Sequence, residues 1–332
     1  MRKPITIVDV AKAAGVSPAT VTHTLNGKRP VGEATKKKVL EAIERLGYVP
    51  SWNASRMKRG HSGIIGCLAA DITETFVNQI VRGIESGLSG GQYSLFFVSG
   101  IEFGNDLERA YNFLKSHKVE GILFCHHIPI WKDFNLDTKN SDIPIVSINM
   151  AASDMISVVS DNMKGGYQAA EHLYGCGMRH PAMICGPEDR LSVEDRLKGF
   201  SDRIRELNLQ MPEEKYYGNY DFDHGMEATQ RLMVGHPLTD GIFCANDYIA
   251  AGAIAALQKM GYQVPGQVRV VGFDNRDFSE FWNVPITTFE LPLQEMGMLG
   301  ISLLRQVIHT GTYSKAEHVL QSKLIPRRSS IG

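Results

Sequence analysis

Polar side chains follow several apolar stretches of the sequence at the point where each stretch ends. Asp71 follows the first stretch, Asn149 a later one, and Asn246 and Asp274 the last two, while Arg196 adds a fixed cation in the segment SVEDRLKGF. Carboxylates, amides and a guanidinium bind the hydroxyl groups of a polyol, and an aromatic ring stacks on its apolar face. The pattern favours a sugar-like ligand, although a single Asp or Asn after a strand is as often a turn residue.

Other chemistry has little support in the sequence. His117 and the adjacent pair His126-His127 have no carboxylate at ligand spacing, and adjacent side chains cannot share one face of a helix or strand. The sequence contains no G-x-S-x-G nucleophile elbow, no P-loop and no G-x-G-x-x-G fingerprint. We therefore predict no metal, no cofactor and no catalytic activity.

The expected location of the chain is the bacterial cytoplasm. The basic start of the sequence is not followed by the apolar segment of a secretory signal, and no apolar run approaches the roughly 20 residues of a membrane span. The five cysteines include no C-x-x-C pair, which favours reduced, mostly buried thiols over disulfides. They are Cys67, Cys125, Cys176, Cys185 and Cys244.

From residue 63 onward, apolar runs alternate with amphipathic stretches. The predicted strands are Gly63–Ala69, Tyr93–Val98, Gly121–Cys125, Ile145–Ile148, Ala182–Cys185, Gly241–Cys244 and Val268–Phe273. The predicted helices are Val77–Leu88, Leu107–Lys115, Gly165–Tyr174, Arg196–Leu207, Gly225–Met233, Tyr248–Lys259 and Gln294–Ile308. Apolar strands separated by helices are typical of parallel sheets covered on both faces. The strand-and-helix units are more numerous than one sheet comfortably holds, so we expect two lobes. We expect the ligand cleft between them, at the carboxyl ends of the strands.

The charge of the chain is unevenly distributed. Residues 1–60 contain 12 Lys and Arg against 4 Asp and Glu, whereas the whole chain has a net charge of -1. A cationic head on an anionic body favours a polyanion that binds at one end only.

The basic segment predicts three helices. Thr6 is a good N-cap for the first, which Gly15 ends, and Ser17-Pro18 begins the second. The third is predicted over Glu33–Leu46, with Lys36, Lys37 and Lys38 on its outer side. The apolar positions of the first and third helices are Val8, Val10, Ala11, Ala14, Val39, Leu40, Ile43 and Leu46. Two short helices joined by a glycine turn, with a third behind them, predict a helix-turn-helix whose second helix recognises DNA.

The first 60 residues resemble the head and hinge of the lactose-repressor/galactose-repressor (LacI/GalR) family. The match consists of T-I-x-D-V-A-x-x-A-G-V-S-x-x-T-V at 6–21, L-N-G at 25–27 and G-Y-V-P at 47–50. Later matches are R-L-x-G-F at 196–200, C-A-N-D-Y-I-A-A-G at 244–252 and V-V-G-F-D-N at 270–275. The resemblance implies a small all-α helix-turn-helix head plus an α/β, two-lobed, periplasmic-binding-protein-like effector domain.

Recognition-helix geometry and the resemblance together imply a set of DNA-binding residues. They are Thr6, Ser17, Pro18, Ala19, Thr20, Thr22, His23, Asn26, Ser51, Asn53, Ala54, Met57 and Lys58. Three positions depart from the common family pattern. His23 replaces an Arg, the usual reader of guanine, Met57 replaces a Leu that wedges between base steps, and Gly32 replaces a Ser cap. The sequence of the operator therefore cannot be predicted from the common family pattern.

The resemblance also implies the effector site and the division of the chain. The expected effector-binding residues are Asp71, Phe76, Asn149, Arg196, Tyr220, Asn246 and Asp274, with Asn149 standing where many members have Asp. The expected domains are a head at 1–50, a hinge at 51–61 and an effector and dimerisation domain at 62–332. Its N-lobe spans about 62–160 and 290–320, and its C-lobe about 161–289 and 321–332. The hinge is too short to form a stable helix alone and is expected to fold on DNA.

The sequence thus predicts a homodimeric transcriptional repressor that binds double-stranded operator DNA under the control of a small-molecule effector. A sugar is favoured, and a sugar phosphate or nucleoside remains open, as do the sign of regulation and the target genes. A sugar-binding protein without DNA binding is the main alternative, and the helix-turn-helix disfavours it. A nucleoid protein without an effector is a second alternative, and the polar strand ends disfavour that.

Overall fold

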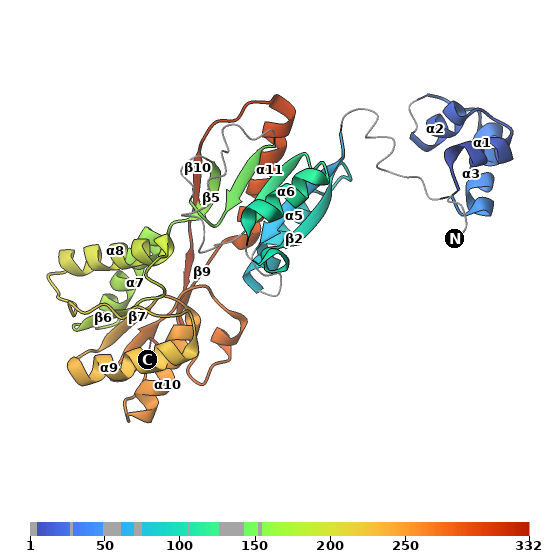
Figure 1. The fold of residues 1–332 in the computed structure, drawn as a ribbon. Coiled ribbons are helices and arrows are strands. Elements are labelled where there is room, and N and C mark those ends of the chain that lie inside the picture. The colour runs from blue at the N-terminus through green and yellow to red at the C-terminus, as the bar shows by residue number, and fades with distance from the viewer. Residues whose placement is uncertain are drawn as a thin grey trace. The chain divides into compact units, whose positions relative to one another are not determined.

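The computed structural model describes residues 5–26, 29–48, 61–69, 75–104, 106–125, 143–151 and 155–331. These residues belong to two compact units, Met1–Gly63 and Ile64–Gly332 (Figure 1). Within the described ranges, no helix has the length and apolar character needed to cross a bilayer.

The first unit contains the three predicted helices. They are α1 (Ile7–Ala14), α2 (Pro18–Asn26) and α3 (Glu33–Leu46). The Asp9 carboxylate accepts hydrogen bonds from both the backbone N–H and the hydroxyl of Thr6, at 2.8 and 2.7 Å, and so fixes the start of α1. Gly15 ends α1 with a φ of 66°, a left-handed conformation that favours glycine. Because Gly15 ends α1 and α2 begins at Pro18, the turn between the two helices is short.

The core of the head is small and formed by all three helices. Its buried members are Val10, Ala11, Val21, Val39 and Ala42. Two predicted core positions are wrong, because Val8 and Leu40 are exposed. Ile7 packs on the core in place of Val8, since the N-cap at Thr6 sets the rotation of α1.

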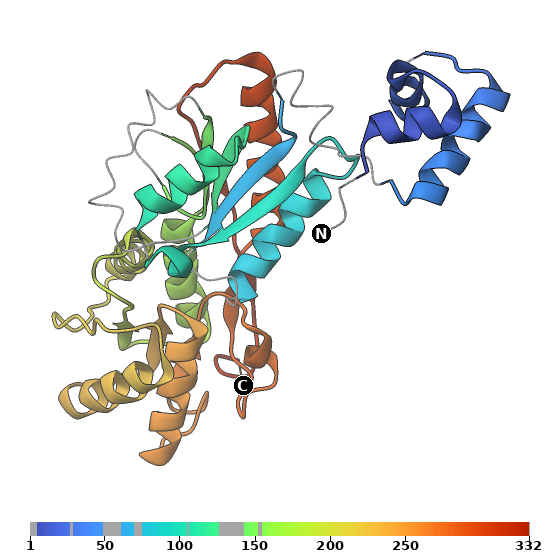
Figure 2. The same ribbon diagram turned by 45° about the vertical axis from the view of Figure 1, so that its right-hand side comes forward.

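The second unit begins with a six-stranded sheet that is parallel throughout. Its strands are β1 (Ile64–Ala69), β2 (Ser94–Ser99), β3 (Gly121–Cys125), β4 (Ile145–Ile148), β5 (Ile156–Ser160) and β10 (Glu317–Leu320), in the order β10-β5-β4-β3-β1-β2. Helices α5 (Thr75–Gly87) and α11 (Leu293–Thr310) pack against each other, and their side chains share a core with one face of the sheet. Helix α6 (Leu107–Ser116) covers the other face (Figure 2).

A second parallel sheet contains three strands, β6 (Pro181–Ile184), β7 (Gly241–Cys244) and β8 (Arg269–Val271), in that order. Helices α7 (Asn162–Gly175) and α8 (Leu191–Glu206) pair on one side, and α9 (Phe222–Gly235) and α10 (Asp247–Lys259) pair on the other (Figure 1). Two parallel sheets, each covered by helices on both faces, confirm the predicted α/β fold class. The carboxyl ends of β7 and β8 are followed by two of the residues that the sequence singled out, Asn246 and Asp274.

Four strands were not predicted. These are β5, β10 and the antiparallel pair β9 (Thr288–Glu290) and β11 (Lys323–Ile325). Strands β9, β10 and β11 are each three or four residues long, and β10 and β11 are only partly buried. None of these three forms the apolar run by which a strand is recognised in a sequence. Strand β10 joins the first sheet beside β5, although 160 residues separate each pair of register partners in the chain.

Helices α7 and α8 cross at very close range because each carries a glycine at the crossing. A Cβ atom added to Gly166 on α7 would lie 2.0 Å from the carbonyl oxygen of Arg196 on α8. A Cβ atom added to Gly199 on α8 would lie 1.8 Å from the carbonyl oxygen of Met163 on α7. The position of the Arg196 backbone therefore depends on the absence of a side chain at Gly166.

We expect Gly166→Ala to lower the free energy of unfolding by about 1–3 kcal/mol, because the new methyl group must push the two helices apart. Gly175→Ala is the matched control, since Gly175 is the last residue of the same helix and has nothing within 4 Å of the added atom. Urea unfolding of both variants measures the difference. Equal stabilities of the two variants would show that the crossing tolerates a methyl group.

Candidate nucleic-acid interface and ligand cleft

The predicted recognition helix α2 presents a small and mainly polar surface. Pro18 and Ala19 are exposed, and Thr20, Thr22 and His23 are partly exposed. The Ser17 hydroxyl accepts a hydrogen bond from the backbone N–H of Thr20 at 3.1 Å, and the Thr22 hydroxyl donates to the carbonyl oxygen of Pro18 at 3.0 Å. These bonds hold the hydroxyl groups in fixed directions and leave lone pairs on their oxygens. The side chain of Asn26 lies outside the described atoms.

The basic surface of the head includes one face of α3. Lys36, Lys37 and Lys38 are exposed, as predicted, and one of them, Lys36, lies 3.7 Å from the carboxylate of Glu33. Thr6 is exposed at the start of α1. The predicted hinge residues Ser51, Asn53, Ala54, Met57 and Lys58 lie outside the described residues.

Arg196 forms the centre of the polar cluster in the second unit. The residue is only 5% exposed, and its Nε donates to the amide oxygen of Asn162 at 2.9 Å. One Nη donates to the carbonyl oxygen of Ala245, and the other lies 3.6 Å from a carboxylate oxygen of Asp274. The guanidinium also lies over the Phe273 ring, 3.7 Å from its centroid. The first residue of α7 and the carboxyl ends of β7 and β8 are thereby tied to one side chain.

The helix that carries Arg196 is longer than predicted. We expected the helix to begin at Arg196, but α8 begins at Leu191, so Arg196 lies in its second turn. The prediction was wrong because the charged run S-V-E-D reads as a loop, whereas in the structure Val193 from this run is buried and holds the first turn against the body. The guanidinium therefore projects from a rigid helix rather than from a loop.

Asp274 is held between two arginines. Its second carboxylate oxygen lies 3.7 Å from Arg276, opposite the oxygen that faces Arg196. Burial raises the pKa of Asp274 above its ordinary value, and the two nearby guanidinium groups oppose that effect. Its φ of 101° lies in the left-handed region, so the backbone is strained at the point where the side chain turns toward Arg196.

Asn246 and Asp247 fix the start of α10. The Asn246 amide oxygen accepts from the backbone N–H of Ile249 at 2.9 Å, the helix-capping role that the sequence left open. The buried Asp247 carboxylate accepts from the hydroxyls of Thr288 and Ser279 and from the N–H of Arg276, at 2.6, 2.7 and 2.8 Å. Burial raises the pKa of Asp247 to about 7, although these hydrogen bonds oppose the shift.

The remaining predicted ligand residues lie in three different places. Tyr220 lies against Gly186, where an added Cβ would be 2.4 Å from its ring, and it is close enough to Arg196 and Asp274 for their charges to affect its pKa, which burial raises. Asn149 follows β4 with a φ of 64° and lines a cavity. Phe76 is buried in the first turn of α5. Asp71 lies outside the described residues.

That cavity has a volume of about 380 Å³ and lies where the first sheet meets α7 and α8. It is lined by Asn149, Met150, Ala151, Val159, Ser160, Asp161, Asn162, Met163, Leu191, Ser192, Asp195, Glu317 and Val319. Asn162 also accepts the hydrogen bond from Arg196, so the cavity adjoins the polar cluster. Sequence reasoning identified only Asn149 among its lining residues, because the others belong to no motif.

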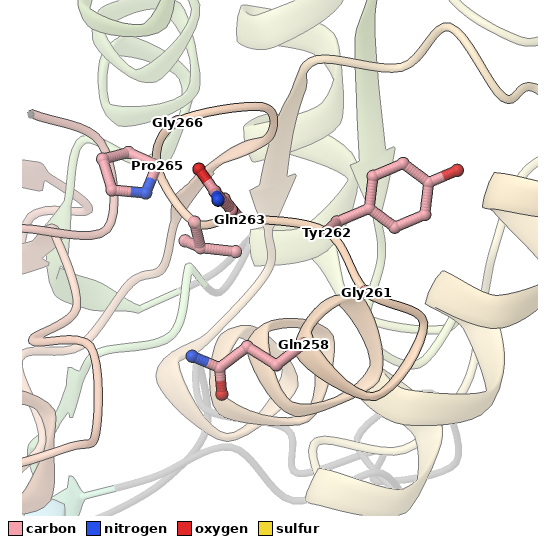
Figure 3. A pocket seen from close by; sticks show the side chains of 7 residues that line it. Gln258, Gly261, Tyr262, Gln263, Pro265 and Gly266 are labelled. Carbon is pink, nitrogen blue, oxygen red and sulfur yellow. The ribbon is translucent and has the colours of Figure 1, made fainter.

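A second hollow has a different character. It is lined by Gln258, Gly261, Tyr262, Gln263, Val264, Pro265 and Gly266, which come from the end of α10 and the turn after it. Figure 3 shows that Tyr262 points away from Gln263 and Pro265, so these side chains do not converge on one point. The hollow contains neither a charged side chain nor a predicted ligand residue, and we assign it no role.

Comparison with known proteins matches two separate parts of the chain to two family models. Residues 6–51 match the family model "Bacterial regulatory proteins, lacI family", and residues 170–330 match a periplasmic binding protein-like domain. The chain is similar to a ribose operon repressor of Halalkalibacterium halodurans, with 30% identity over 98% of this chain and 97% of the relative. It is also similar to the transcriptional repressor PurR of Vibrio vulnificus, with 29% identity over 97% of each chain.

A solved structure confirms the fold. A Lac repressor dimer bound to operator and an anti-inducer matches with a TM-score of 0.88 at 24% identity, over 99% of this chain and 100% of that one. A three-helix head of this type and a two-sheet body with a buried polar cluster at the strand ends define a DNA-binding transcription regulator. The chain belongs to the LacI family of bacterial regulatory proteins.

Proposed function

We propose that the protein is a homodimeric cytoplasmic repressor whose affinity for operator DNA is controlled by a small-molecule effector. In this proposal the head at 1–50 reads the operator, and a hinge at 51–61 connects it to the effector domain at 62–332. The effector binds between two lobes, beside Arg196, and changes the spacing of the hinges of the two protomers. The operator equilibrium shifts only as far as the effector discriminates between the two states of the dimer. The proposal includes no catalytic activity.

The observation that carries this proposal is the burial of Arg196 with Asp274. A buried ion pair is costly to desolvate and is weak evidence for a stabilising role, so its presence at the strand ends favours a binding role. The guanidinium is prepositioned by Asn162 and Ala245, which limits the entropy lost when a ligand binds. Asn246, Tyr220, Phe76, Asn149 and Asp71 complete the proposed effector set.

A sugar-type effector is supported by the same cluster. Carboxylate, amide and guanidinium groups together match the donor and acceptor pattern of a polyol. The name of the Halalkalibacterium relative refers to the operon of a sugar, ribose.

The proposed dimer is supported by an exposed aromatic surface. Phe281 is 83% exposed, and it directly follows the short helix η3 (Asp277–Glu280). Within that region, Phe278 packs against Tyr248 and Trp282, with ring centroids 4.9 and 5.7 Å apart. Exposed aromatic side chains are enriched at the centres of protein interfaces. The Lac repressor that shares this fold is described as a dimer.

Selection of binding sites from random DNA duplexes tests the proposal, and we expect an enriched pseudo-palindrome with one half-site per protomer. Repeating the selection with His23→Ala should relax base preference at one position in each half-site and cost about 1–3 kcal/mol there, if His23 contacts a base edge. His180→Ala, at an exposed histidine in the second unit, is the control. No enriched sequence with the wild-type protein would contradict the proposed function, and an unchanged preference with His23→Ala would contradict the role of that residue.

A further inference from the structure

The cavity of about 380 Å³ beside Arg196 has an unusual charge pattern. Its lining includes three carboxylates, from Asp161, Asp195 and Glu317, and no Lys, Arg or His. They come from the start of α7, the first turns of α8 and the edge strand β10, so the fold rather than one local motif gathers them. A lining of this kind repels phosphate and carboxylate groups and attracts cations.

The three carboxylates form no ion pair with a cation in the described part of the chain. Asp161 accepts from the backbone N–H of Lys164 at 2.9 Å and from the side-chain amide of Gln321 at 3.1 Å, and neither donor is a cation. Among the described residues, neither Asp195 nor Glu317 has a Lys, Arg or His partner at ion-pair distance. Burial raises the pKa of Asp195, repulsion from nearby carboxylates adds to the shift, and the charge of Arg196 opposes it. The cavity therefore holds negative charge that a bound cation would stabilise.

The rest of the lining indicates an organic ligand. Leu191 is 57% exposed, and Met163 and Val319 are also exposed, so apolar side chains line a cavity open to solvent. Ser160, which is 4% exposed, also lines the cavity, and its hydroxyl oxygen has no hydrogen-bond partner among the described residues. A buried hydroxyl without a partner is costly, and a ligand group in reach of it would remove that cost.

A metal ion does not fit these observations. Within the described ranges, no three His, Cys, Asp or Glu side chains converge closely enough to hold one. The carboxylates instead surround a space large enough for an organic group, with apolar side chains beside them.

We propose that this cavity binds a protonated amino group of the effector, and that the effector is an amine-bearing polyol of the amino-sugar class. The hydroxyl groups of such a molecule bind at the Arg196 and Asp274 cluster, and its ammonium group lies between Asp195 and Glu317. This inference rests on the proposed effector control and adds the charge of the ligand to it.

Matched pairs of ligands test the proposal. Glucosamine, galactosamine and mannosamine are each compared with the neutral parent sugar and with the N-acetyl derivative, by calorimetric titration of the full-length protein. We expect at least one amine to bind about tenfold or more tightly than both of its neutral counterparts. The reason is that the amine gains a charge pair in a partly buried site, which the neutral sugars cannot form. If no amine in the panel binds more tightly than its neutral counterparts, the proposal is overturned.

Two carboxylate variants locate the site. Asp195→Asn should weaken binding of the preferred amine by about tenfold, and Glu317→Gln, at an exposed position, by about two- to fivefold. Both variants should leave the binding of neutral sugars unaffected. Glu227→Gln, at an exposed position on α9, is the control, and operator binding without ligand checks that each variant is folded. Unchanged amine affinity in both cavity variants would contradict this site. If the amine binds but leaves operator affinity unchanged, the proposed function is contradicted and this inference is not. If neutral sugars release the operator and amines do not, this inference is contradicted and the proposed function is not.

Discussion

The Arg196→Ala variant is expected to retain operator binding and to lose all response to the effector. Arg196 belongs to the second unit, whereas the residues proposed to contact DNA belong to the first unit and the hinge. The alanine variant removes the guanidinium that is proposed to bind ligand hydroxyl groups. It also removes the contact from α8 to the ends of β7 and β8, by which ligand binding would be transmitted. Operator titration with and without effector measures both properties.

The same variant is expected to be markedly less stable. Removing one partner of a buried ion pair leaves the other uncompensated, which typically costs about 3–5 kcal/mol. In this protein the partner is Asp274, whose one other cation at ion-pair distance among the described residues is Arg276, at 3.7 Å. Arg205→Ala is the matched control, because Arg205 lies on the same helix, is exposed and, among the described residues, pairs with Asp202 alone. We expect a change within about 0.5 kcal/mol for this variant.

A double-mutant cycle separates binding from stability. Asp274→Asn removes the charge that Arg196→Ala leaves behind, so the double variant should be more stable than the sum of the two single effects by about 1–3 kcal/mol. It should still fail to respond to the effector. An Arg196→Ala protein with undiminished effector response would remove this residue from the proposed site, whatever its stability.

The parts of the fold that the sequence predicted are those with a periodic apolar pattern. Strand β3 and helix α3 have the predicted bounds because an unbroken apolar run and a regular apolar stripe define them. Strand β10 was not predicted, because it is half-exposed and gains its backbone hydrogen bonds from β5, far away in the sequence. Edge strands of this kind are determined by tertiary pairing rather than by local composition.

The candidate site shows the same division between local and long-range information. Arg196 and Asp274 were identified from motifs, and the structure brings them within 3.6 Å of each other. The acidic cavity was not predicted, since Asp195 and Glu317 are more than 120 residues apart and neither belongs to a motif. Neither an aspartate on a helix nor a glutamate on a strand indicates a ligand site by itself. Only the fold brings them together.

Asp247→Asn is expected to change how stability depends on pH. Burial raises the pKa of Asp247 in the native state to about 7, above its ordinary value of 3.8. Between these two values the native state holds a proton that the unfolded state releases, so the contribution of Asp247 to stability decreases as pH rises from about 4 to 7. The contribution is fully present below pH 4. Asparagine cannot ionise, so the variant lacks this dependence.

The stability of Asp247→Asn relative to wild type should therefore rise with pH by up to about 1.4 kcal/mol per unit, and by about 4 kcal/mol in total across the window. Urea unfolding at intervals from pH 4.5 to 8 measures the difference. Asp277→Asn, at an exposed aspartate on η3, should show no such trend. A difference between wild type and Asp247→Asn that stays constant with pH would show that Asp247 is ionised throughout. The hydroxyls of Thr288 and Ser279 and the N–H of Arg276 would then stabilise the carboxylate more than burial destabilises it.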